Sequence, residues 1–128
     1  MKRVSNKHCR PLVQERKPFR GSNMYAEWIP TTVEGDERYV VYSYGIHWPL
    51  FIYTQGCWFE NEQRHSQSTT IHRSHAHPHH PTILLSTHWM RVLADFGYSK
   101  IAKERILGTD MRPIRQSRES ALMAYFGG

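Results

Sequence analysis

Two absences limit the kinds of protein that this sequence can encode. Only two cysteines, Cys9 and Cys57, occur among 128 residues, which is too few for a disulfide scaffold, so we expect two free thiols. No run of about 18 apolar residues is present, and the basic start MKRVSNKHCR precedes no apolar stretch, so neither a membrane span nor a secretory signal is indicated. The sequence therefore predicts a cytoplasmic protein.

The sequence also has no motif of a common catalytic site. It contains no G-x-S-x-G nucleophile motif, no glycine-rich phosphate loop and no pattern of paired carboxylates. A hydroxyl and an imidazole could still meet across a turn, because four Ser and Thr residues at 66–70 lie between His65 and His72. Hydroxyls of this kind more often bond to the backbone of a turn. We therefore favour a protein that is not an enzyme; a small histidine-dependent hydrolase or nuclease, with or without a metal, is the alternative.

Positive charge, by contrast, is abundant and concentrated at the start of the chain. The formal net charge is +6, and residues 1–20 carry seven Lys and Arg side chains against one Glu. We interpret residues 1–20 as a flexible basic arm and residues 21–128 as a single domain, long enough to bury one modest core. A basic arm is either a solvated terminus or an electrostatic contact with nucleic acid.

Aromatic and β-branched residues cluster in the first half of the domain. They form short segments that Pro or Gly separates, which is typical of strands. The expected strands are 24–29, 38–45, 49–54 and 57–60. Both faces of 38–45 carry apolar side chains, so we expect both faces of that strand to be covered.

The hydrophobic period lengthens after residue 85. Apolar residues from Trp89 to Phe96 recur at i, i+3, i+4 and i+7, which predicts a helix that Ser86 or Thr87 caps and that ends at Gly97. Two further helices are expected, at 99–107 and 117–126. The predicted class is α+β, with a small antiparallel sheet of three or four strands and the C-terminal helices packed on it.

The two helices around Gly97 could also form a helix-turn-helix motif. The turn glycine and the basic second helix, with Lys100, Lys103 and Arg105, fit a recognition element. The packing positions fit poorly, since Leu93 stands where the motif needs a small residue and Lys103 where it needs an apolar anchor. We favour two helices that cover the sheet and expose a basic face.

Five histidines occur within nine residues near the middle of the chain: His72, His75, His77, His79 and His80. Pro78 and Pro81 exclude a helix there, so we expect an extended loop between the sheet and the first helix. Alternate residues of an extended chain share one side, so His75, His77 and His79 could converge on one metal ion such as zinc. We expect no required cofactor, only the adventitious zinc affinity of a histidine-rich loop.

The segment from Tyr39 to His72 contains four blocks in a characteristic order: YVVYSYG, HWPLFIY, WFEN and SQSTTIH. This order resembles a module of short uncharacterised proteins carried by phages and plasmids, a family whose function is not known. The resemblance implies a mobile-element origin and a bacterial host. Small phage proteins often bind nucleic-acid machinery, including defence nucleases, so the resemblance favours such a partner by association.

These observations predict a non-enzymatic accessory protein that binds nucleic acid or a nucleoprotein machine, with inhibition of a host defence nuclease as one form of that role. Basic side chains supply phosphate contacts, and aromatic rings stack on bases. The expected contact residues are Lys2, Arg3, Lys7, Arg10, Arg16, Lys17, Arg20, Tyr42, Tyr44, Trp48, Lys100, Lys103 and Arg105.

Overall fold

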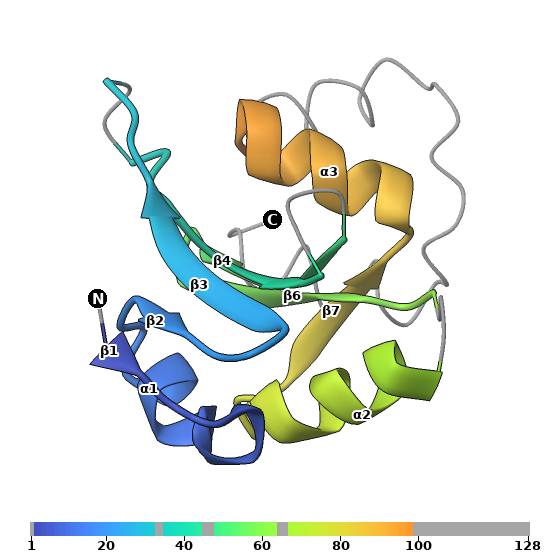
Figure 1. Cartoon of the computed structure of the whole chain (residues 1–128). Coiled ribbons are helices and arrows are strands. Elements are labelled where there is room, and N and C mark those ends of the chain that lie inside the picture. Colours follow the sequence, from blue (N-terminus) through green and yellow to red (C-terminus); the bar gives the residue numbers. More distant parts are fainter. Residues whose placement is uncertain (1, 33–34, 45–47, 64–66, 99–128) are drawn as a thin grey trace.

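The computed structural model describes residues 2–32, 35–44, 48–63 and 67–98 (Figure 1). Its strands are β1 (Lys2–Arg3), β2 (Phe19–Arg20), β3 (Met24–Ile29), β4 (Arg38–Ser43), β5 (Pro49–Thr54), β6 (Cys57–Asn61) and β7 (Thr82–Leu85). Its helices are the 3-10 helix η1 (Asn6–His8) and the α-helices α1 (Arg10–Gln14), α2 (Gln67–Ala76) and α3 (Thr87–Phe96). The four strands expected from the sequence are confirmed as β3 to β6.

The strands form one mixed sheet of seven strands, in the order β1 to β7. The pairs β1–β2 and β6–β7 are parallel, and the four pairs between them are antiparallel. The class is α+β, but the expected small antiparallel sheet of three or four strands is wrong. The missed strands have two to four residues, too few to show the alternation by which a strand is recognised in a sequence.

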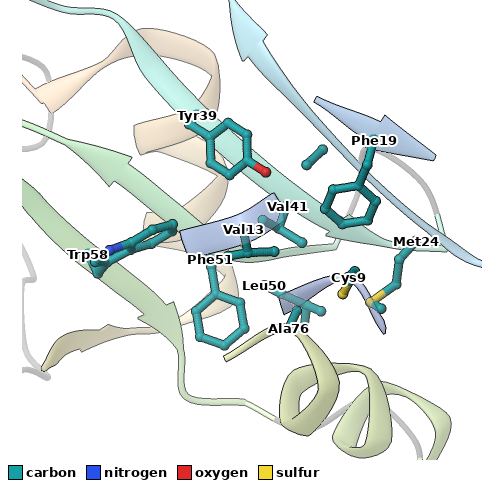
Figure 2. Close-up of a cluster of buried hydrophobic side chains, with 11 residues drawn as sticks. Cys9, Val13, Phe19, Met24, Tyr39, Val41, Leu50, Phe51, Trp58 and Ala76 are labelled. Atoms are coloured by element: carbon teal, nitrogen blue, oxygen red, sulfur yellow. The ribbon is translucent and has the colours of Figure 1, made fainter. Parts of the chain in front are cut away.

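Helices cover both faces of the sheet rather than one (Figure 1). α3 packs on one face, over a core that includes Val40, Ile52 and Phe59. α1 and α2 lie on the other face, over a core that includes Val41 and Phe51 (Figure 2). Strand β4 is therefore buried on both faces, as expected, and full burial of an apolar side chain such as Val40 or Val41 contributes about 1.5–3 kcal/mol.

Residues 2–20 belong to the sheet and to the helices packed on it instead of forming a separate arm. Residues 2–20 build β1, η1, α1 and β2, and they bury Cys9, Val13 and Phe19 completely (Figure 2). The charge of this segment hides these apolar positions when the sequence is read for composition alone. Both Cys9 and Cys57 are free and buried, and burial raises the pKa of each thiol to about 11.

The predicted boundaries of α3 are confirmed. The Ser86 side chain accepts a hydrogen bond from the Trp89 backbone N–H at 3.3 Å, and Gly97 follows the last turn with a left-handed φ of 87°. The helices expected at 99–107 and 117–126, and with them the helix-turn-helix question, lie outside the described residues. Within the described ranges, no helix is long and apolar enough to cross a membrane.

Candidate functional site

A surface groove lies where the first three strands meet, and we name it the Arg20 groove. It consists of two adjoining hollows, of about 450 Å³ and about 310 Å³, that share Arg20, Gly21 and Ser22. The arginine half adds Arg3, Val4 and Ser5. The tyrosine half adds Asn23, Met24, Tyr25 and Tyr44. Of the described residues that line either half, none is acidic.

The strand register brings the basic side chains of the groove together. Arg3 of β1 is the register partner of Arg20 of β2, and Arg20 is in turn the partner of Tyr25 of β3. The Arg20 guanidinium carbon lies 5.7 Å from the centre of the Tyr25 ring, which stacks on Tyr42 at 4.9 Å. Like charges on paired strand positions repel, so an anion bound between Arg3 and Arg20 would relieve an unfavourable contact.

Tyr44 projects from the end of β4 into the tyrosine half of the groove. Its side chain is 57% exposed, and its backbone has a left-handed φ of 60°, which is unfavourable for a bulky residue. Its N–H donates a hydrogen bond to the Asn23 carbonyl at 2.8 Å, and its ring lies 5.1 Å from the His72 ring. Backbone strain that the surroundings maintain is a feature of functional sites.

A neutral hydrogen-bonded cluster of Asn6, Ser43 and His72 adjoins the groove, through the Ser22 N–H and the Tyr44 ring. Asn6 Oδ1 accepts from the Ser22 N–H at 3.1 Å, so Asn6 Nδ2 donates to His72 Nε2 at 3.4 Å. His72 Nδ1–H then donates to Ser43 Oγ at 2.8 Å. Burial lowers the pKa of His72, and the neighbouring His75 lowers it further, so the imidazole is neutral at pH 7.

This tautomer decides what Ser43 and His72 can do chemically. A nucleophilic serine needs an imidazole nitrogen that accepts its proton, whereas here the imidazole donates to Ser43. Ser43 is also fully buried, so a substrate does not reach it. With this tautomer the pair supports the structure around the groove.

Ser43 and His72 were not paired by the sequence analysis, which considered only hydroxyls at 66–70 as partners of His72. The signal that could have found them lies in the quoted blocks, because Ser43 belongs to YVVYSYG and His72 to SQSTTIH. These blocks form β4 and α2, whose packing brings the two residues into contact across 29 positions of the chain.

The described residues among the predicted contacts do not all line the groove. Arg3, Arg20 and Tyr44 line the groove, and Lys2 and Lys7 are exposed on neighbouring elements. Three basic residues have partners outside the groove: Arg10 donates to the carbonyls of Ser74 and His77, Arg16 lies over the Tyr53 ring, and Lys17 pairs with Glu15. Tyr42 is buried and Trp48 is half-buried. Lys100, Lys103 and Arg105 lie outside the described residues. Sequence analysis missed Tyr25, which it assigned only to a strand.

The histidine-rich segment is not the extended loop that we expected, because α2 runs as far as Ala76 and includes His72 and His75. Pro78 blocks a helix only from the residue before it, so the helix ends there instead of being absent. Among the described residues, no group of three His, Cys, Asp or Glu side chains is placed to hold a metal ion. His75, His77 and His79, which could converge in an extended chain, are not grouped in this way.

A second buried polar cluster surrounds Glu60 on β6. Arg73 Nη2 and Nε both lie 2.7 Å from Glu60 Oε2, and the Thr82 hydroxyl donates to Oε1 at 2.6 Å. His77 Nδ1 accepts from the His79 N–H at 2.9 Å, so its Nε2–H faces Glu60 Oε1 at 3.4 Å. Burial lowers the pKa of His77, although the Glu60 carboxylate opposes that shift.

Both oxygens of Glu60 are used within this cluster, and the carboxylate is only 6% exposed. The cluster therefore joins β6, α2 and β7, the elements of the parallel crossover, and leaves no carboxylate oxygen for a substrate.

Comparison of the chain with protein-family models, with curated proteins and with solved structures found no match.

Proposed function

We propose that this protein binds nucleic acid through the Arg20 groove, as a non-enzymatic accessory protein. One observation carries the proposal: Arg3 and Arg20 lie side by side in a groove whose described lining has no acidic residue and which Tyr44 borders. Arginine presents several N–H donors in a planar fork that matches a phosphate group. Two such forks next to exposed tyrosine suit a nucleic-acid strand.

The groove favours phosphate over an isolated carboxylate as the bound group. Its arginine half has a volume of about 450 Å³ and is lined by Arg3 of β1 and Arg20 of β2, which leaves room for a group larger than a carboxylate. Lys2 and Lys7 are exposed on the adjoining elements and add to the positive potential. The formal net charge of +6 supports association with a polyanion.

The same arginines support the wider form of the proposal, in which the partner is a nucleoprotein machine in the cytoplasm of a bacterial host. A protein that occupies the nucleic-acid site of a defence nuclease would inhibit it. The histidine-dependent hydrolase is the weaker alternative, because Ser43 is buried and accepts a hydrogen bond, and Glu60 is fully paired.

The proposal is tested by fluorescence anisotropy with labelled oligonucleotides between about 50 and 200 mM salt. We expect Arg20→Ala to weaken binding roughly tenfold and to lower the slope of log K against log salt by about 0.7 to 0.9, the share of one phosphate contact. Lys17→Ala is the matched control, because it removes the same charge only three positions away and outside the groove. Equal affinity of the Arg20→Ala and Lys17→Ala variants, or no oligonucleotide binding by the unmodified protein, would contradict the proposal.

A further inference from the structure

We infer that the tyrosine half of the Arg20 groove binds an unpaired nucleobase, so that the preferred ligand is single-stranded. This inference rests on the proposed function and names its class of ligand. Tyr25, Tyr44 and Arg20 line a hollow of about 310 Å³, which is within the range of small-molecule sites. Rings and a guanidinium plane are the side chains on which unpaired bases stack.

The position of Tyr44 is the strongest support for this inference. A tyrosine that only contributed to the core would be buried, whereas Tyr44 is 57% exposed and adopts a left-handed φ of 60°. The Asn23 carbonyl holds its backbone, and the His72 ring contacts its own ring at 5.1 Å. An aromatic ring that is fixed in advance loses little conformational entropy when a base stacks on it.

The arginine half of the groove suits the phosphate of a nucleotide, and the tyrosine half suits its base. Arg20 belongs to both hollows, so a phosphate near Arg3 and Arg20 leaves the attached base beside the tyrosine half. Asn6 connects the groove to the ring that contacts Tyr44, because its side chain bonds to the Ser22 N–H and to His72. The bases of a duplex are paired and stacked inside the helix, so they reach such a hollow only after extrusion, which is unfavourable.

The test compares three probes of equal length: a single strand, a duplex, and a single strand with abasic sites that keeps every phosphate. We expect the unmodified protein to bind the single strand at least tenfold more tightly than either other probe. Tyr44→Ala should weaken single-strand binding about 5- to 150-fold, as expected for one lost stack, and leave duplex binding unchanged. Tyr44→Phe keeps the ring and should behave as the unmodified protein.

Two further variants separate stacking from folding. Tyr44→Asn tolerates the left-handed backbone better than alanine does and should show the same loss as Tyr44→Ala, with an unchanged circular dichroism spectrum. Phe96→Ala removes an aromatic ring that is 62% exposed outside the groove, and it should leave all three affinities unchanged.

The outcomes distinguish this inference from the proposed function. Equal binding of single strand and duplex, with Tyr44→Ala indistinguishable from the unmodified protein, overturns the nucleobase site while the phosphate groove stands. No binding of any probe overturns the proposed function and this inference with it. A mononucleotide that displaces the single strand, and fails to bind the Tyr44→Ala variant, supports the nucleobase site.

Discussion

Two consecutive residues of α2, His72 and Arg73, belong to two different buried clusters. His72 belongs to the neutral cluster with Asn6 and Ser43, whereas Arg73 belongs to the charged cluster around Glu60. The Glu60 cluster satisfies its carboxylate within the fold. The His72 cluster continues to the surface, because Asn6 holds the Ser22 backbone and His72 contacts Tyr44, two residues that line the Arg20 groove.

The Glu60 cluster therefore stabilises the fold, whereas the His72 cluster orients residues of the groove. A charge that is buried and fully paired strongly penalises the loss of either partner, which suits a cluster that joins three elements. A neutral chain of donors and acceptors fixes directions at a smaller energetic cost, which suits residues that orient a surface. We therefore expect changes in the Glu60 cluster to affect stability most, and changes in the His72 cluster to affect stability less and the groove more.

The largest effect is expected from Arg73→Ala. This change leaves the Glu60 carboxylate buried without its cation, so the free energy of unfolding should fall by about 3 kcal/mol. Urea denaturation followed by circular dichroism measures the loss. Replacing both partners with leucine should recover most of it, because an apolar pair leaves no unpaired charge. A loss below about 1 kcal/mol for Arg73→Ala would show that water already reaches the carboxylate.

An intermediate effect is expected from Gly21→Ala in the groove. A Cβ at this position would collide with Asn6 Oδ1, so Asn6 must give up its bonds to Ser22 and His72. We expect a loss of about 1–2 kcal/mol in the free energy of unfolding, together with weaker oligonucleotide binding.

The Asn6→Ala background provides the control for that change, since it removes the colliding atom. In a double-mutant cycle, Gly21→Ala should then have a much smaller additional effect on stability. Equal losses in both backgrounds would show that Asn6 does not limit the space at Gly21.

A smaller effect is expected from acidification. The pKa of His72 in the folded protein lies below its ordinary value, so its neutral form contributes stability that is complete above about pH 6.5 and is lost as the pH falls below it. Protonated Nε2 would face the Asn6 amide, and His75 would add a like charge. The free energy of unfolding should therefore decrease between about pH 7 and pH 5.

Variants of His72 and His77, one from each cluster, show which histidine causes the pH dependence of stability. The pKa of His77 is also lowered by burial and by His79, Arg10 and Arg73, but the Glu60 carboxylate opposes that shift, whereas both causes at His72 lower its pKa. We expect His72→Gln to flatten the pH dependence more than His77→Gln does. The reverse order, measured by denaturation at several pH values, would assign the sensitivity to the Glu60 cluster.

The sequence predicted the centre of this fold better than its edges. β3 to β6 and α3 carry strong signals, namely aromatic and β-branched runs and an apolar stripe between a serine cap and a glycine. β1 and β2 are two residues long, and α2 has the mainly polar sequence QSTTIHRSHA, so neither has a clear periodicity. Tertiary packing, rather than local pattern, determines these elements.

The groove was only partly predictable for a related reason. The concentration of basic residues at 1–20 drew attention to Arg3 and Arg20, and the capacity of aromatic rings to stack on bases drew attention to Tyr44. Charge alone does not show which basic residues meet. That depends on the register of β1 with β2 and of β2 with β3. The cluster that adjoins the groove joins Asn6 to His72 across 66 positions, a contact that no local pattern in the sequence encodes.

The smallest effect is expected from the exposed ion pair of Lys17 and Glu15. Its nitrogen and oxygen lie 3.1 Å apart, close to the 2.7 Å of Arg73 and Glu60, but both side chains are 62% exposed. Water screens such a pair and already solvates each partner, so Lys17→Ala should change the free energy of unfolding by about 0.5 kcal/mol or less. Double-mutant cycles, measured by urea denaturation, give the coupling energy of each pair. Because the two nitrogen–oxygen distances are similar, a difference in coupling energy reports the effect of burial. A coupling energy at the exposed pair as large as that at Glu60 would show that distance, and not burial, sets the strength of the Glu60 cluster.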